Sequence, residues 1–187
     1  MKKIEFDVNI YALDQDPRRA AQYHNDRHVG KQILSTVQIL TATHILEDTW
    51  PTASARVPSA ATIVLPSSIV QHPCVRWCRA GSDNYRWLWY LLNDLIEEFG
   101  MRFKKTHPYA YFKSELFKRP LNLRVRPLSP WPQYLPPQFV RADPIEAYRL
   151  FYVHKKRHLA QWSRPSMMPM WWTELSKREN IRDEQTA

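Results

Sequence analysis

The sequence predicts a mainly α-helical protein with a single compact domain. Apolar residues recur at helical spacing in three long stretches of the chain, and an Asp-Pro pair, which is typical of a helix start, precedes two of them. The 187 residues include fifteen Pro and three Gly, so we expect rigid turns between the helices. This length suits one domain, which we place at residues 1–176, followed by a polar tail at residues 177–187.

The N-terminal region predicts a short strand followed by a long helix. Apolar residues alternate with polar ones over residues 4–10, which is the period of a strand. Asp16 then precedes Pro17, as an N-cap residue precedes the first position of many helices. The helical pattern continues to about residue 47, with a break expected near Asn25 or Gly30.

Proline-rich connections separate the remaining predicted helices. Residues 48–72 predict a loop, and residues 74–104 predict a second long helix in two pieces. A short helix is expected at residues 109–118. Six prolines exclude a continuous helix at residues 119–142, where we expect an ordered extended segment with apolar anchors rather than disorder. Residues 143–162 predict the last helix.

Charge and composition indicate the class of partner. The net charge is +9, the pI is about 9.7, and the chain contains eight Trp, nine Tyr and seven Phe. These features favour nucleic acid as a partner, before an acidic membrane surface. No apolar run approaches the length of a membrane span, so we expect an intracellular protein with no membrane partner. Cys74 and Cys78 are too few for a four-cysteine zinc site and predict buried free thiols in a reducing cytoplasm.

The stretch from Tyr23 to Lys31 is the most informative motif. On a helix, one face carries polar groups and the opposite face is apolar; the polar face holds His24, His28, Lys31, Ser35 and Gln38. Imidazole, ammonium and guanidinium groups in one place favour a phosphate-like anion held by Arg27, His28 and Lys31. A zinc-peptidase motif would need Glu where Asn25 stands. Two alternatives remain open: a metal site with a ligand from elsewhere, and a solvated face with one buried histidine.

Other polar residues could complete the same site. Asp14 follows the predicted strand and could act as a base or bridge a metal, whereas Asp16 is better explained as a helix cap. His72, Arg76 and Asn84 are further candidates, because Arg76 could contact phosphates and the other two are polar groups beside aromatic residues. The helical spacing of apolar residues alone would assign Tyr85 to the hydrophobic core. His107 and Arg102 lie at the end of the second long helix, where Arg102 is expected to pair with Glu98 on the surface.

The C-terminal part of the chain predicts a surface that contacts nucleic acid. Basic residues cluster at the end of the last predicted helix, and aromatic residues follow them. This pattern fits binding to the sugar-phosphate backbone rather than reading of base sequence. A basic helix end is also expected from the helix dipole alone. The expected DNA-binding residues are Lys155, Lys156, Arg157, Arg164 and Trp171.

Several of these motifs together resemble a widespread family of small bacteriophage proteins. The resemblance covers nearly the whole chain except residues 1–8 and 48–70. It rests on Asn9-Ile10-Tyr11-Ala12-Leu13-Asp14, Asp26-x-His28-Val29-x-Lys31, His72-Pro73-Cys74, Asn84-Tyr85-x-Trp87-Leu88, Glu98-x3-Arg102 with His107, Asp143-Pro144-x-Glu146-Ala147-Tyr148, and the closing Arg164 and Trp171-Trp172. The family resembled is that of the glutamyl/putrescinyl thymine pyrophosphorylase-like proteins, which are linked to the amino acid:DNA transferases of thymine hypermodification.

The resemblance implies a DNA-modifying transferase in the cytoplasm of an infected bacterial host. In this reaction a pyrophosphorylated 5-hydroxymethyluracil in phage DNA loses pyrophosphate, while an amino acid or another amine joins the methylene carbon. The sequence leaves open the identity of the amine, the oligomeric state, and whether Mg²⁺ bridges the pyrophosphate and Asp14.

The resemblance also implies roles for individual residues. Lys31, His28 and Arg102 would stabilise the departing pyrophosphate, and Asp14 or a histidine would deprotonate the amine. Tyr85 or Trp77 would receive a base that leaves the stack. We therefore expect catalysis from Asp14, His28, Lys31 and His72, and substrate binding by Asp26, Arg27, Arg76, Asn84, Tyr85, Arg102 and His107.

Two other functions remain open from the sequence. The first is a DNA glycosylase or lyase, on a helical fold like that of the DNA glycosylases, in which an amine such as Lys31 traps the sugar carbon. The second is a phage DNA-binding protein without enzymatic activity. The sequence contains no P-loop, dinucleotide-binding glycine motif or serine-hydrolase motif, which argues against the usual nucleotide kinases, oxidoreductases and serine hydrolases.

Overall fold

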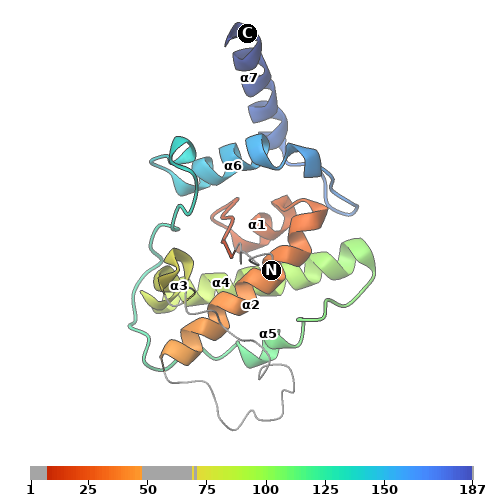
Figure 1. Ribbon diagram of the computed structural model, residues 1–187. Helices are drawn as coiled ribbons and strands as arrows, with labels where there is room; N and C mark the ends of the chain where they lie inside the picture. Colours follow the sequence, from red (N-terminus) through yellow and green to blue (C-terminus); the bar gives the residue numbers. More distant parts are fainter. Residues whose placement is uncertain (1–7, 48–68, 70, 187) are drawn as a thin grey trace, which may run out of the picture.

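Two long helices, α2 (Asp26–Leu46) and α4 (Ser82–Phe103), pack against each other at the centre of the protein (Figure 1). The computed structural model describes residues 8–47, 69 and 71–186, with side chains up to residue 179. This part of the chain is mainly helical and forms one compact domain, as predicted. None of its helices is long and apolar enough to cross a membrane.

The first predicted helix is divided into α1 (Pro17–Tyr23) and α2. The Asp16 carboxylate accepts hydrogen bonds from two N–H groups in the first turn of α1 and so caps this helix, as expected. α1 ends at His24, and the side-chain oxygen of Asn25 accepts a hydrogen bond from the His28 N–H at 2.9 Å to begin α2. The predicted break near Asn25 is therefore confirmed.

The predicted N-terminal strand is not confirmed. Residues 8–13 are buried but have no regular secondary structure, and residues 1–7 lie outside the described part of the chain. Side-chain hydrogen bonds hold this segment instead of strand pairing. The Asn9 amide donates to the carbonyl of Tyr134 at 2.9 Å, and the Tyr148 hydroxyl donates to the Asn9 side-chain oxygen at 3.0 Å.

The second predicted helix is divided into α3 (Pro73–Arg79) and α4, as expected. No side chain caps α4. Its first two N–H groups donate to the carbonyls of Arg124 and Arg126 in the proline-rich segment, at 2.9 and 3.3 Å. A Cβ atom at the N-cap residue, Gly81, would lie 2.9 Å from the Arg126 Cβ, so this close approach requires glycine. The predicted loop at residues 48–72 lies almost entirely outside the described residues.

The proline-rich segment that follows α5 (Phe112–Glu115) runs along the body of the protein and contains no α-helix, as predicted. Its one regular turn is the 3-10 helix η4 (Pro137–Phe139). Asn84 fixes its middle: the amide donates to the Trp77 carbonyl at 2.7 Å and to the Ser129 hydroxyl at 2.9 Å, and it accepts from the Ser129 N–H at 2.9 Å. Asn84 therefore holds the segment against the α3–α4 junction.

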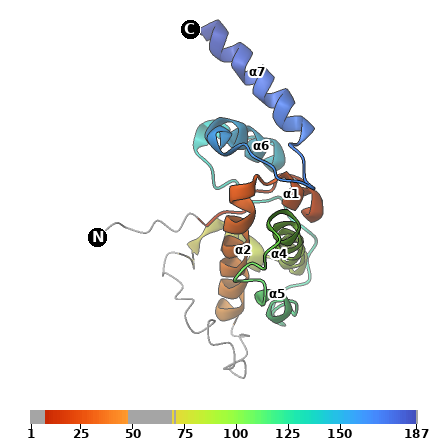
Figure 2. The ribbon, with the colours of Figure 1, turned by 90° about the vertical axis from the view of Figure 1, so that its right-hand side faces the viewer.

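The last predicted helix is shorter than expected. α6 (Pro144–Lys155) is followed by the 3-10 turn η5 (Arg157–Leu159), so the predicted end near Trp162 is wrong. Beyond this turn, the Gln161 carbonyl accepts a hydrogen bond from the Asp26 N–H at 2.8 Å, which joins this segment to the start of α2. α7 (Met170–Thr186) then extends away from the body of the protein (Figures 1 and 2), so the predicted polar tail is part of a helix.

Arg102 joins α4 to the break between α1 and α2. Its side chain is fully buried, and its Nε donates to Glu98 at 2.7 Å. The two terminal nitrogens donate to the carbonyls of His24 and Gln22, at 2.8 and 2.9 Å, and to Asp26 at 3.0 Å. Asp26 also accepts hydrogen bonds from the N–H and the hydroxyl of Ser163, at 2.9 and 2.6 Å. The pair predicted on the surface is therefore a buried cluster that joins three segments.

We predict that Arg102→Met lowers the free energy of unfolding by about 3–5 kcal/mol, because two carboxylates and two carbonyls lose their common donor. Chemical denaturation followed by circular dichroism measures this change. Arg86→Met on the same helix is the control: Arg86 is mostly exposed and pairs with Asp83 at 3.5 Å, so its loss should cost less than about 1 kcal/mol. Similar losses in both variants would contradict the structural role of Arg102.

Candidate functional site

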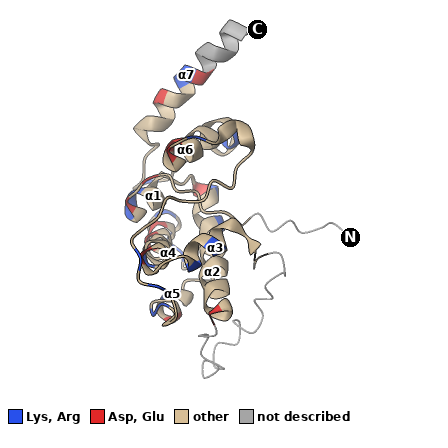
Figure 3. Ribbon diagram, turned by 90° about the vertical axis from the view of Figure 1, so that its left-hand side faces the viewer, with Lys and Arg blue, Asp and Glu red and all other residues tan. Residues whose placement is uncertain are grey.

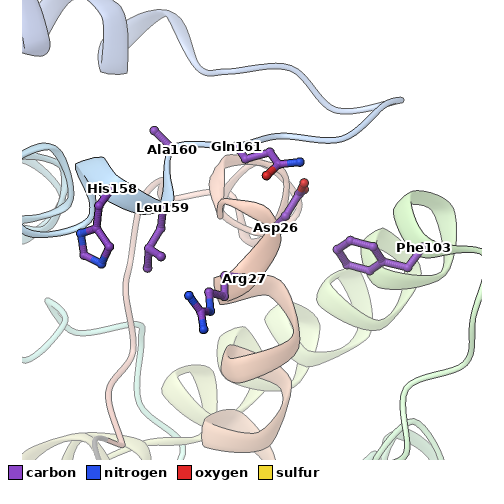
Figure 4. A pocket seen from close by; sticks show the side chains of 7 residues that line it. All are labelled: Asp26, Arg27, Phe103, His158, Leu159, Ala160 and Gln161. Atoms are coloured by element: carbon purple, nitrogen blue, oxygen red, sulfur yellow. The ribbon is translucent and has the colours of Figure 1, made fainter.

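A cavity of about 490 Å³ opens at the first turn of α2 (Figure 4). On one side it is lined by Asp26 and Arg27 of α2 and by Phe103 at the end of α4, and on the other by the segment from His158 to Gln161. Asp26 is already bound by Arg102 and Ser163. Arg27, by contrast, is exposed, and the guanidinium and the His158 imidazole are the basic groups at this opening.

His28 is buried one turn into α2, next to this cavity. Its ring lies against the rings of Tyr11 and Tyr152, with centroids 5.2 and 5.1 Å away. Burial and the positive charges of Lys156, Lys31 and His158, together with His24, lower the pKa of His28 to about 2. The imidazole is therefore neutral at pH 7. His28 is therefore not the cation that the sequence predicted. The cations that act on it, Lys31 and Lys156, come from α2 and from the segment after α6.

His24 is a second neutral histidine at the same helix junction. Burial is the main reason that its pKa falls to about 3. Its Nδ1 lies 2.6 Å from the Ala20 carbonyl, so the proton is on Nδ1 and donates to that oxygen. The Nε2 of His24 and the Nδ1 of His28 are both buried without a hydrogen-bond partner in the described chain. This junction therefore contains two uncharged imidazoles, each with one buried nitrogen that has no hydrogen-bond partner in the described chain.

The polar face predicted for α2 is largely inside the protein. His24, His28, Ser35 and Gln38 are buried, and Lys31 is the exposed member of the set. α2 is covered on its other sides by α4, α3 and the buried N-terminal segment. Packing on several sides therefore leaves α2 few exposed positions near its start, Arg27 and Lys31, and places most of the predicted polar face inside the protein.

The segment after α6 adds Lys156 to the site. Its ammonium group lies over the rings of Phe151 and Tyr11, at 5.7 and 6.0 Å from the centroids. The neighbouring Lys155 is exposed and lies over the Phe139 ring at 5.9 Å. These two lysines and the exposed Arg157 form one basic edge beside the cavity, at the position predicted for contacts with a nucleic-acid backbone.

Asp14 and Trp171 belong to a different cluster. Asp14 accepts from Arg149 at 3.0 Å, and Arg149 also donates to the Leu13 carbonyl at 2.8 Å. The same guanidinium lies over the rings of Trp171 and Tyr23, at 5.2 and 5.7 Å. Trp171 is largely buried in this cluster, away from the basic residues with which it was predicted to contact DNA. Asp14 lies outside the set of residues that line the α2 cavity.

Tyr85 is a core residue that lies far from the α2 cavity. Burial raises the pKa of its hydroxyl, which donates to the Leu116 carbonyl at 2.8 Å and lies 2.8 Å from the His44 imidazole. His44 and His28 are sixteen residues apart on α2, which corresponds to about 24 Å along the helix. The structure therefore does not bring Tyr85 together with the residues at the start of α2.

Other predicted site residues have structural roles or lie outside the cavity. Asn84 holds the proline-rich segment, Arg102 is the buried clamp, and His72 caps α3 by accepting from the Cys74 N–H at 3.2 Å. Arg76 is exposed on α3. His107 packs against Phe99 beside Gly30 of α2, and burial lowers its pKa. The structure thus brings together Asp26, Arg27, His28, Lys31 and Lys156 of the predicted set.

Sequence reasoning missed residues that reach this site from distant parts of the chain. Tyr11 and Tyr152 enclose His28, and His158 completes the basic opening. Arg149, the partner of Asp14, was also missed. The basic cluster at residues 154–158 was the one sequence signal for these contacts. No local pattern indicates that Tyr152 of α6 contacts Tyr11.

Cysteine and metal chemistry is not evident in the described residues. Cys74 and Cys78 are buried free thiols, as predicted, and burial raises the pKa of each to about 12. No three His, Cys, Asp or Glu side chains of the described chain lie close enough together to hold a metal ion.

Comparison of the chain with protein-family models, with curated proteins and with solved structures gives no match. The resemblance to the thymine pyrophosphorylase-like family therefore stays a prediction that depends on the motifs alone.

We predict that the protein loses stability as the pH falls below about 6.5. Because the pKa values of folded His24 and His28 are depressed, the unfolded chain binds more protons in this range, and acid favours unfolding. Each imidazole should contribute up to about 1.4 kcal/mol per pH unit. Urea denaturation at pH 7, 6 and 5 measures the slope.

The double variant His24→Gln and His28→Gln should show a flatter dependence of stability on pH than the natural protein. His158→Gln is the control, because His158 is exposed and its loss should leave the slope nearly unchanged. An equal slope in the natural protein and in the double variant would show that other groups control acid unfolding.

Proposed function

We propose that this protein is a DNA-modifying transferase whose α2 cavity binds a phosphate-like leaving group, with pyrophosphate on a 5-methylene carbon of a uracil base as the substrate group. One observation carries the proposal. The exposed Arg27 of α2 and His158 after α6 line one cavity of about 490 Å³, and the charges of Lys31, Lys156 and His158 act, after burial and His24, on the nearby imidazole of His28. Such convergence produces a local positive potential that suits a multiply charged anion.

The charge of the whole molecule supports a polyanionic substrate but does not locate the site. Lys and Arg occur on several elements (Figure 3). The cavity differs from these surfaces because its basic lining residues, Arg27 and His158, come from two separate segments of the chain. The basic edge formed by Lys155, Lys156 and Arg157 continues from the cavity and would hold the DNA backbone beside it.

The proposed reaction is a substitution at the methylene carbon. The carbon–oxygen bond breaks and its electron pair leaves with pyrophosphate, while the amine nitrogen forms a bond to the same carbon and then loses a proton. Arg27, Lys31 and Lys156 stabilise the charge that develops on the departing oxygen. His28 accepts the proton of the amine.

The pKa of His28 fits this role only when the anion is bound. Burial is the main reason that the pKa of His28 is low, and His24, Lys156, Lys31 and His158 lower it further. A bound pyrophosphate cancels this positive potential, so the pKa of His28 rises and the imidazole becomes a stronger base. Binding of the leaving group would therefore activate the base, and an empty enzyme would keep it uncharged.

The alternative lyase mechanism has weaker support. A lysine that forms a Schiff base is normally desolvated in an apolar pocket, whereas Lys31 is exposed on α2. A DNA-binding protein without enzymatic activity would need the basic edge but not the buried imidazole. Pyrophosphate binding, product formation and borohydride trapping distinguish both alternatives from a transferase.

We predict that pyrophosphate binds at the α2 cavity and shifts the imidazole resonances of His28 in NMR spectra. Lys156→Ala should weaken pyrophosphate binding roughly tenfold through the loss of one charge-assisted contact. Lys155→Ala is the matched control, because Lys155 lies over Phe139 instead of Tyr11; its effect should be below about twofold. Equal responses of the two variants, or no shift of His28, would contradict the anion site.

We predict that incubation of the protein with pyrophosphorylated 5-hydroxymethyluracil DNA and a mixture of amino acids and amines releases pyrophosphate and yields an amine-substituted nucleoside. Mass spectrometry of the digested nucleosides detects the product. His28→Gln should lower turnover about 10²–10⁴-fold while pyrophosphate still binds. Absence of any new nucleoside with folded protein contradicts the transferase, and a covalent adduct after borohydride treatment with DNA would support the lyase instead.

A further inference from the structure

A second cavity, of about 570 Å³, lies beside the buried Glu98–Arg102–Asp26 cluster. Glu98 lines this cavity, whereas Asp26 lines the first one, so Arg102 lies between two openings. The walls come from α1, α4, α6 and the chain from Pro165 to Trp171. A volume of this size is in the range that holds a small organic ligand.

The first unusual group in this cavity is the buried carboxylate of Glu98. Its hydrogen bonds within the described chain all fall on Oε1, which accepts from Arg102 at 2.7 Å and from the hydroxyl of Ser166. The second oxygen, Oε2, has no such bond, and the residue is 2% exposed. An acceptor of this kind in the wall of a cavity suits an ammonium group of a ligand.

Two guanidinium groups line the same cavity. Arg149 is held rigidly by Asp14, by the Leu13 carbonyl, and by the rings of Tyr23 and Trp171. Those bonds use its Nε and one terminal nitrogen, so the other terminal nitrogen is available for a ligand. Arg18 of α1 is exposed in the same wall. A carboxylate is the natural partner for two guanidinium groups in one place.

Much of the remaining wall of the cavity is apolar. It is lined by four methionines, Met101, Met167, Met168 and Met170, of which Met167 and Met170 are each 80% exposed. Methionine side chains adapt to apolar groups of varied shape. A charged side chain on the ligand would find no partner among these thioethers, whereas an aliphatic one would be covered by them.

We propose that this second cavity binds a small zwitterion, an α-amino acid with an aliphatic side chain. The ammonium group lies at Glu98, the carboxylate at Arg149 and Arg18, and the side chain among the methionines. Binding itself does not depend on the DNA reaction. The further role of this amino acid as the incoming amine rests on the proposed function.

Isothermal titration calorimetry of the full chain without DNA tests this site. L-Leucine is the probe; 3-methylbutylamine lacks the carboxylate, 4-methylpentanoate lacks the amine, and L-glutamate has a charged side chain. We expect L-leucine to bind and each of the other three compounds to bind at least about tenfold more weakly. Arg18→Ala should weaken L-leucine roughly tenfold, and the adjacent Arg19→Ala, which does not line the cavity, should leave the affinity unchanged.

Three results would overturn the proposal: no heat of binding for L-leucine at millimolar concentration, equal affinity for one of the truncated compounds, or equal losses in the two arginine variants. Both variants change exposed side chains at the start of α1, so folding should persist, and circular dichroism checks it. L-Leucine binding without a DNA reaction would reject only the transferase, whereas a DNA reaction without L-leucine binding would reject only this cavity as the amino-acid site.

Discussion

The buried guanidinium of Arg102 is the constraint on which the rest of the structure depends. The interruption of the helix at His24 and Asn25 leaves the carbonyls of Gln22 and His24 without helical partners, and Arg102 supplies donors to both. The same group forms ion pairs with both Glu98 and Asp26, and each of these carboxylates lines one of the two cavities. The start of α2, the position of the chain after α6 and the shapes of both cavities therefore follow from one planar group with five N–H donors.

The parts of the fold that local chemistry determines could be predicted from the sequence. An Asp-Pro pair begins α1 and another begins α6, because a carboxylate cap and a proline act on the first turn without help from elsewhere. The start of α4 is different: its donors are satisfied by the carbonyls of Arg124 and Arg126, more than forty residues away. The chain after α6 is likewise held by a bond between Gln161 and Asp26, residues 135 positions apart, and periodicity cannot indicate such a contact.

The candidate site was predictable in its residue types more than in its geometry. The histidine and lysine spacing identified the start of α2, but burial depends on packing by Tyr11 and Tyr152, and burial decides that His28 is neutral. Charge alone could not distinguish Lys31, which is exposed, from Arg102, which is buried. An aromatic residue near basic residues in the sequence can either stack on a nucleic-acid base or pack against a basic side chain of the protein. In this structure Trp171 packs against the guanidinium of Arg149.

The two serines after α6 have a consequence for how this protein can vary. Ser163 is bonded to Asp26 and Ser166 to Glu98, so the chain is fixed at two points three residues apart. Surface loops ordinarily tolerate insertions and deletions, because a longer loop costs little entropy. Here one residue more or fewer between the two serines would pull one of them from its carboxylate. The length of this short connection is therefore constrained by two carboxylates, although the residue beside Ser163, Arg164, is itself exposed.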